Sequence, residues 1–283
     1  MPTAIPVVLV HGFWHGSWCW SALTEELAGR EIASVAIDLA GHGLNSSSPQ
    51  SRWARPFDPT GYATEMSPVA DVTASSAAAE LVEQIRRIGQ GRPCVVVAHS
   101  MGGVVATAAA ELAPELFAEL VYLTAFAPVS GLPAGAYIGS PENAGEQVSG
   151  LLVGDPFAIG ALRIDAVGQA AAVRETFYQD VDERTGSAAI AMLSSDGPAG
   201  VPGEAFAVTP ERFGSIGHTY LVCTRDNAIP VALQRRFVTE IDAVSVKPTT
   251  VVELDASHSP FFSQPVALAD AVEAVVGRRA VPA

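Results

Sequence analysis

The chain has 283 residues, of which 49% are hydrophobic and only 16% are charged, so it can bury a substantial core and is not of the disordered class. Its formal net charge of -14 argues against binding to nucleic acid or anionic membranes, because both need Lys and Arg to neutralise phosphate. No apolar run reaches the roughly 18 residues that span a bilayer, and the N-terminus does not resemble a signal peptide. We expect a cytoplasmic globular protein.

The first half of the chain alternates between short apolar runs and helical segments. Residues 44–75 interrupt this alternation with a stretch rich in Ser, Pro, Thr and Asp that has no periodicity, which predicts a long loop. The three cysteines fit no metal-ligand spacing, so they are expected as free thiols. The pattern predicts strands at 6–10, 33–39, 94–98 and 120–124, and helices at 17–30, 77–88 and 101–113.

The second half loses this rhythm and then recovers it. Residues 128–210 carry many Gly and Pro, and after them the pattern predicts strands at 219–223 and 249–254 and helices at 231–241 and 265–277. Strands that alternate with helices indicate an α/β fold with a mostly parallel central sheet and helices on both faces. We predict a core formed by residues 1–127 and 211–283, with 128–210 inserted as a cap.

A serine follows the predicted strand at 94–98 directly and precedes a helix. Small residues surround Ser100: Ala98 two positions before it, and Gly102 and Gly103 after it. This is the pattern of a nucleophile elbow, G-x-S-x-G, in which a sharp turn exposes the hydroxyl; Ala98 replaces the first glycine but is also small. A serine that only caps the helix and a phosphate-binding loop are the alternatives, and the glycine spacing of the latter is absent. Ser100 is the candidate nucleophile.

A general base for this serine has to be one of six histidines. His258 follows the last predicted strand in a loop, at the carboxyl edge of the sheet where ligand crevices form. His99 precedes the nucleophile and is expected to point away from it, and His218 begins a strand, where an edge or core role is expected. We predict His258 as the base.

The acid that orients the base is expected in the loop after the preceding strand. Asp226 lies there, and the chain order Ser, Asp, His is the order that this fold uses. Asp255 is the competing candidate, but its position just before His258 indicates a turn residue.

Two backbone N–H groups are expected to stabilise the oxyanion. One is that of Met101, directly after the nucleophile, and the other is that of Phe13, in the loop after the first strand. Gly12 lets this loop approach the substrate closely.

These motifs resemble the α/β-hydrolase superfamily, and within it the methylesterase and hydroxynitrile lyase branch best known from plants. The resemblance covers the core and says little about the cap or residues 44–75. The matching segments are residues 10–20, 98–103, 121–128, 214–216, 220–230 and the loop around His258.

The branch contains esterases and lyases, and two positions separate them. The lyases usually have Thr where this chain has Gly12, and Lys where it has Ser259. The resemblance therefore implies an esterase of the serine type that needs no metal or organic cofactor. Its partner is a small hydrophobic or aromatic ester, and whether the chain is a monomer or a homodimer is left open.

Five residues near the predicted loops are expected to bind this substrate: Gly12, Trp14, Phe126, Phe261 and Phe262. Two other functions stay open. The same triad could open a lactone, cyclise a metabolite or cleave a carbon–carbon bond, since fold does not fix reaction. The chain could also be a small-molecule binding protein on a hydrolase scaffold.

Overall fold

A computed structural model describes residues 5–280. Its centre is a six-stranded sheet in the order β2-β1-β3-β4-β7-β8, and every neighbouring pair of strands is parallel. The predicted mostly parallel sheet is therefore confirmed, and all six carboxyl ends lie at one edge. The strands are β1 (Val7–Val10), β2 (Ser34–Ile37), β3 (Cys94–Ser100), β4 (Phe117–Ala125), β7 (His218–Cys223) and β8 (Thr250–Leu254).

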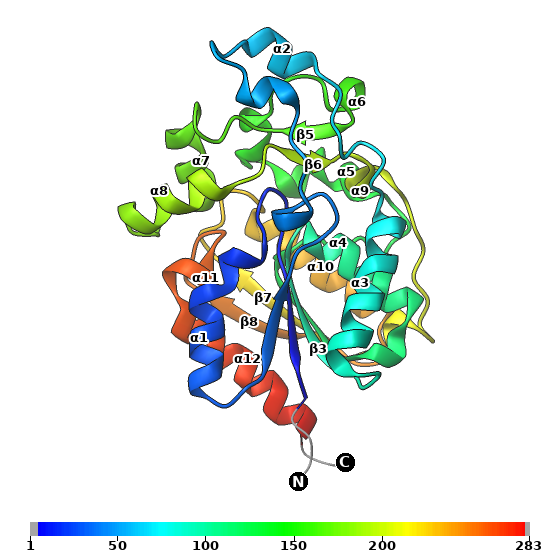
Figure 1. The fold of residues 1–283 in the computed structure, drawn as a ribbon. Coiled ribbons are helices and arrows are strands. Elements are labelled where there is room, and N and C mark those ends of the chain that lie inside the picture. The colour runs from blue at the N-terminus through cyan, green and yellow to red at the C-terminus, as the bar shows by residue number, and fades with distance from the viewer. Residues whose placement is uncertain (1–4, 281–283) are drawn as a thin grey trace.

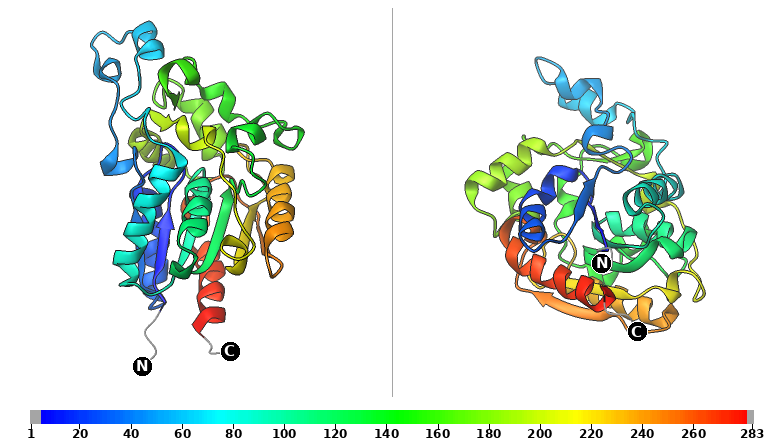
Figure 2. Two further views of the ribbon diagram at one scale, coloured as in Figure 1. Left: turned by 90° about the vertical axis from the view of Figure 1, so that its right-hand side faces the viewer. Right: turned by 60° about the horizontal axis from the view of Figure 1, so that its bottom comes forward.

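Helices cover both faces of the sheet (Figures 1 and 2). Strand residues alternate between two cores: Val8 and Val10 belong to one apolar cluster, and Val7 and Leu9 belong to the other. The long helices that pack on the first face and contribute to its cluster are α3 (Ala74–Gly89), α4 (Gly102–Leu112) and α10 (Val231–Val244). Those that pack on the second face are α1 (Ser21–Gly29) and α12 (Pro265–Ala280).

Helix α3 begins three residues before the predicted start at residue 77. The reason is a capping box, in which the Thr73 hydroxyl accepts a hydrogen bond from Ser76 N and the Ser76 hydroxyl accepts one from Thr73 N. The prediction of a loop without regular structure over residues 44–75 is also wrong in part. Asp58 and Pro59 start the short helix α2 (Pro59–Thr64), and a 3₁₀ turn covers Gln50–Trp53.

Residues 128–210 lie above the carboxyl edge of the sheet (Figure 1). They contain short helices and one antiparallel pair of strands, β5 (Ala161–Arg163) and β6 (Asp196–Pro198). The boundaries of the cap at 127 and 211 stay a prediction. The helices of this region are α5 (Ala134–Ile138), α6 (Pro156–Ile159), α7 (Ala170–Phe177), α8 (Glu183–Met192) and α9 (Gly200–Gly203).

Arg163 forms a buried ion pair within this region and also joins it to the segment around α2. Arg163 Nε and Nη2 donate to the two carboxylate oxygens of Asp196 at 2.8 and 2.7 Å, and Arg163 Nη1 donates to the carbonyls of Tyr62 and Glu65. Arg163 is fully buried and Asp196 is 2% exposed. The guanidinium thus fixes α2 to the β5–β6 pair. Between residues 5 and 280, no helix is long and apolar enough to cross a membrane.

Candidate active site

Ser100 occupies a strained turn between β3 and α4. Its φ is +53°, a left-handed value that residues with a Cβ rarely adopt. Two close approaches explain the glycines that follow: a Cβ on Gly102 would lie 2.2 Å from the His11 carbonyl oxygen, and one on Gly103 would lie 2.3 Å from that of Phe126. The sequence around Ser100 therefore folds as the predicted sharp turn.

The loop after β1 packs directly against this serine. A Cβ on Gly12 would lie 2.5 Å from Ser100 Cβ and 3.1 Å from Ser100 Oγ. Only glycine fits here without moving the serine, so the threonine of the lyases has no room in this backbone. The same loop brings Phe13 to the site, and neither the Phe13 N–H nor the Met101 N–H donates a hydrogen bond to another described residue.

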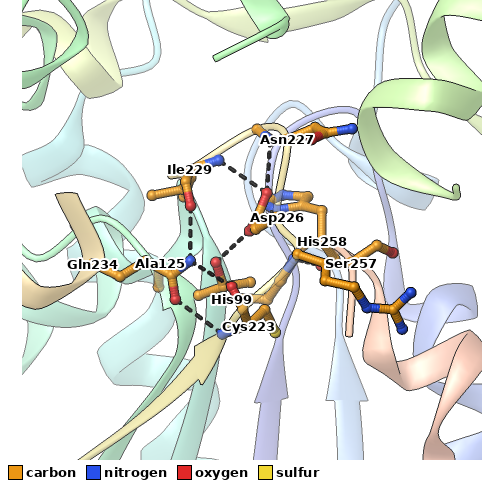
Figure 3. Close-up of polar contacts among 12 residues, drawn as sticks. His99, Ala125, Cys223, Asp226, Asn227, Ile229, Gln234, Ser257 and His258 are labelled. Carbon is orange, nitrogen blue, oxygen red and sulfur yellow. Dashed lines mark hydrogen bonds and ion pairs between the residues drawn. The ribbon is translucent and has the colours of Figure 1, made fainter. Parts of the chain in front are cut away.

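Asp226 and His258 meet at the carboxyl edge of the sheet, as expected from their positions after β7 and β8. His258 Nδ1 lies 2.7 Å from Asp226 Oδ2, and both side chains are almost fully buried. Asp226 Oδ1 accepts hydrogen bonds from the N–H groups of Ala228 and Ile229 at 2.6 and 2.9 Å (Figure 3). These contacts fix the orientation of the carboxylate.

The competing carboxylate, Asp255, points elsewhere. Its side chain is 83% exposed and pairs with Arg225 Nε at 2.8 Å. The predicted preference for Asp226 as the partner of His258 therefore agrees with the geometry.

His99 has a structural contact that the sequence did not indicate. Its Nε2 donates to the backbone carbonyl of His258 at 2.9 Å (Figure 3), and burial holds the pKa of His99 well below its ordinary value. His99 is thus a neutral imidazole that points away from the position of a substrate and holds the loop of His258. Only the fold brings these two residues, 159 positions apart, together.

A cavity lies beside Ser100 and encloses about 530 Å³ of empty space, part of it open to solvent. Its wall contains Ser100, four predicted residues (Phe13, Trp14, Met101 and Phe126) and many residues of the cap. The cap residues could not be predicted because their region has no periodic pattern in the sequence. They are Ile138, Asn143, Glu146, Val148, Ser149, Leu152, Leu162 and Phe177.

Three of the five predicted substrate-binding residues are not in this wall. Among the described residues that line the cavity, Gly12, Phe261 and Phe262 do not occur. Gly12 packs against Ser100 behind the wall. Phe261 is fully buried in the apolar cluster on the α1 and α12 side of the sheet, next to Trp20, and Phe262 stacks on Trp18. The prediction was wrong for these two rings because the short helix Pro260–Ser263 packs them against tryptophans of the 3₁₀ turn Ser17–Trp20.

Comparisons with known proteins fit this architecture. A model of the alpha/beta hydrolase family matches residues 7–271. The chain belongs to this family. Methylesterase 7 of Arabidopsis thaliana is 28% identical to this α/β hydrolase over 265 residues, which cover 91% of each chain. The pyrethroid hydrolase of Sphingobium wenxiniae is 27% identical over 275 residues, which cover 95% of this chain and 87% of the relative.

Solved structures share the fold of this α/β hydrolase. A pyrethroid hydrolase superposes with a TM-score of 0.78 at 22% identity, covering 99% of this chain and 100% of the other. Polyneuridine aldehyde esterase superposes with a TM-score of 0.75 at 21% identity, covering 96% and 99%. The predicted fold and the predicted resemblance to the methylesterase branch are confirmed, and the predicted class of enzyme agrees with the names of these relatives.

The other buried histidines of this α/β hydrolase have structural contacts. Burial lowers the pKa of His11 and His15 to about 3 and that of His42 to about 4. His11 Nε2 accepts from Leu39 N at 3.1 Å, and His15 Nε2 lies 2.7 Å from the Tyr178 hydroxyl. These neutral rings support the loop after β1.

Acid should therefore destabilise the folded protein. His218 lies away from Ser100, so substituting it measures this effect without changing the site. Burial lowers the pKa of His218 to about 4. The nearby charges have smaller effects: Glu119 and Asp242 raise this pKa, and Arg279 lowers it. Below about pH 6.5 the unfolded chain protonates this histidine and the folded chain does not, so stability is lost as pH falls toward 4. From pH 7 to pH 5 this histidine alone accounts for roughly 2 kcal/mol.

Urea unfolding of the wild type and of His218→Gln at pH 7 and pH 5 measures this contribution. The variant should lose less stability between the two pH values than the wild type, by about 2 kcal/mol. Equal losses in both proteins would show that His218 is not held neutral by the fold.

Proposed function

We propose that this protein is a serine esterase that cleaves a small hydrophobic or aromatic carboxylic ester through an acyl-enzyme. The observation that carries the proposal is the 2.7 Å contact between His258 Nδ1 and Asp226 Oδ2 at the sheet edge where Ser100 occupies its strained turn. A carboxylate that fixes one ring nitrogen leaves Nε2 free to serve as the base for a serine.

In the proposed mechanism, Ser100 Oγ attacks the ester carbonyl and His258 Nε2 takes the hydroxyl proton. The N–H groups of Phe13 and Met101 donate to the oxyanion of the tetrahedral intermediate. When the carbon–oxygen bond to the alcohol breaks, His258 returns the proton to the leaving alkoxide. A water molecule then gives a proton to His258, attacks the acyl-enzyme and releases the acid, and the proton returns to Ser100.

The cavity wall supports an uncharged substrate. It is almost entirely apolar, and its polar groups other than Ser100 come from one cap segment, residues 143–149. Asn143 Nδ2 donates to the Ile138 carbonyl at 2.9 Å, while its buried Oδ1 has no partner among the described residues and can accept a hydrogen bond from a substrate hydroxyl. Glu146 adds a negative charge at the wall, which disfavours a substrate with a free carboxylate.

The proposal is tested with a fluorophosphonate and a short-chain aryl ester. The fluorophosphonate should label Ser100, located by mass spectrometry, and the aryl ester should give a burst of alcohol release equal to the number of active sites. Labelling at Ser100 without turnover of simple esters would favour one of the other triad reactions, and tight ligand binding with neither labelling nor ester turnover would favour a binding protein.

Lyase activity is tested by cyanohydrin cleavage. Gly12 has no room for a side chain, and Ser259, which stands where the lyases have Lys, is fully buried. Efficient release of cyanide by the wild type would contradict the esterase proposal.

Glu146→Gln should weaken the discrimination against anionic esters. The measurement compares kcat/KM for a neutral aryl ester with kcat/KM for the same ester bearing a distal carboxylate. We expect the ratio of the first to the second to fall about fivefold in the variant, because one unit charge a few ångströms away contributes about 1 kcal/mol. Glu142→Gln is the matched control, since Glu142 pairs with Arg236 and does not line the cavity. Equal ratios in all three proteins would exclude a role for Glu146 in selecting the substrate.

A further inference from the structure

Near its carboxyl end, strand β4 contains an extra residue beside Ser100. Its pairing with β3 runs in register through Ala98 with Tyr122 and His99 with Leu123, and then Ser100 pairs with Ala125. Thr124 therefore has no partner on β3 and forms a β-bulge. Bulges of this kind redirect side chains and occur often next to active sites.

The bulge changes which face of the sheet each side chain meets. Tyr122 belongs to the core on the α3 and α4 side and Leu123 to the core on the α1 and α12 side, as alternation requires. Ala125 belongs to the same core as Tyr122, although it lies three positions later. The extra residue, Thr124, is fully buried and has φ +36°, a value that is unfavourable for a β-branched side chain.

Surrounding contacts hold the backbone in this conformation. The Tyr220 hydroxyl accepts from Ala125 N at 3.1 Å and donates to the Ala125 carbonyl at 2.7 Å. Phe126 N donates to the Ser100 carbonyl at 3.0 Å, which ties the residues after the bulge to the nucleophile turn. The strain at Thr124 is thus imposed by buried neighbours and is not a feature of a loose loop.

The side chain of the bulged residue reaches the acid. Thr124 Oγ1 donates a hydrogen bond to Asp226 Oδ2, the same oxygen that His258 Nδ1 contacts. The two backbone donors to the other oxygen, Ala228 and Ile229, belong to the loop of Asp226 itself and move with it. Among the described residues, Thr124 is the donor that fixes the carboxylate to the central sheet.

We propose that Thr124 is a positioning residue of the active site: the bulge in β4 directs its hydroxyl to Asp226 and so orients the carboxylate toward His258. This inference rests on the proposed function, because it assigns Thr124 a role in the same triad. The hydroxyl keeps Oδ2 in line with the Nδ1 proton, and by donating to Oδ2 it also withdraws charge from the oxygen that stabilises the imidazolium. Strain near a site of this kind persists only where the surroundings impose it.

Four variants distinguish the effect of the Thr124 hydroxyl on activity from the effects of side-chain packing and of backbone strain. Thr124→Ser keeps the hydroxyl, Thr124→Val keeps the shape without it, and Thr124→Gly removes both the hydroxyl and the backbone strain. Thr107→Val is the matched control, because the Thr107 hydroxyl is also buried, bonds to Gly103 O and Tyr122 Oη, and does not contact Asp226.

We expect Thr124→Val and Thr124→Gly to lower kcat for the aryl ester about tenfold with little change in KM, the factor of one hydrogen bond to a charged group. The apparent pKa of the acid limb of kcat/KM should rise in both, because Oδ2 regains charge and stabilises the imidazolium more strongly. Thr124→Ser should stay within about threefold of the wild type with an unchanged pH profile. Thr107→Val should lose stability without moving the acid limb.

The inference would be overturned if Thr124→Gly had the kcat and the pH profile of the wild type. It would also be overturned if Thr124→Ser and Thr124→Val lost the same amount of kcat. Thr124→Gly keeps the test informative if the valine variant does not fold, since glycine adopts φ +36° without strain. Failure of the proposed function has a different outcome, because the wild type would then hydrolyse the aryl ester without labelling at Ser100.

Discussion

Ser100→Ala should lower kcat for an aryl ester by about 10⁴ to 10⁶ with little change in substrate binding. The variant removes the only atom of this turn that can form the acyl-enzyme, while the cavity wall and the Asp226–His258 pair are left intact. Pre-steady-state kinetics should also show that the burst of alcohol release is lost.

The control for this prediction is Ser215→Ala, an exposed serine of a 3₁₀ turn before β7. It should retain full turnover and the full burst. If Ser100→Ala retained more than about a hundredth of the wild-type kcat after contaminating esterases had been removed, nucleophilic catalysis by Ser100 would be ruled out.

The part of the site that follows from local sequence could be predicted. The strands that precede Ser100, Asp226 and His258 are apolar runs with clear ends, and the carboxyl ends of parallel strands share one edge of the sheet. The Asp226–His258 contact follows from this topology. The glycines at 12, 102 and 103 could also be interpreted, since each allows backbone segments or side chains to approach closely.

Long-range packing decided what could not be predicted. Phe261 follows His258 by only three residues, yet its ring lies in the core beneath the site and not in the cavity. The cap supplies much of the cavity wall from residues without a periodic pattern, and one of them, Leu162, lies on β5 where this strand pairs with β6. The bulge at Thr124 also has no signal in the sequence, which predicts one continuous strand over residues 120–124.

The cap contains a buried ion pair, Arg163 with Asp196, and breaking this pair should have a large effect on stability. Asp196→Asn leaves the fully buried Arg163 guanidinium without its counter-charge, which typically costs about 3–5 kcal/mol. Leu162 lies next to Arg163, lines the cavity and accepts a hydrogen bond from Trp14 Nε1 at 2.9 Å. The same variant should therefore raise KM for the ester.

Urea unfolding of Asp196→Asn measures this loss, and Glu253→Gln is the matched control. Glu253 pairs with Arg235 on the surface, where both side chains are more than half exposed, so its loss should cost less than about 1 kcal/mol. The double variant Arg163→Met with Asp196→Leu should recover much of the stability, because it removes both charges from the interior. If Asp196→Asn were no less stable than Glu253→Gln, the guanidinium would have to find solvent or another partner, and the ion pair would not be what fixes the cap to α2.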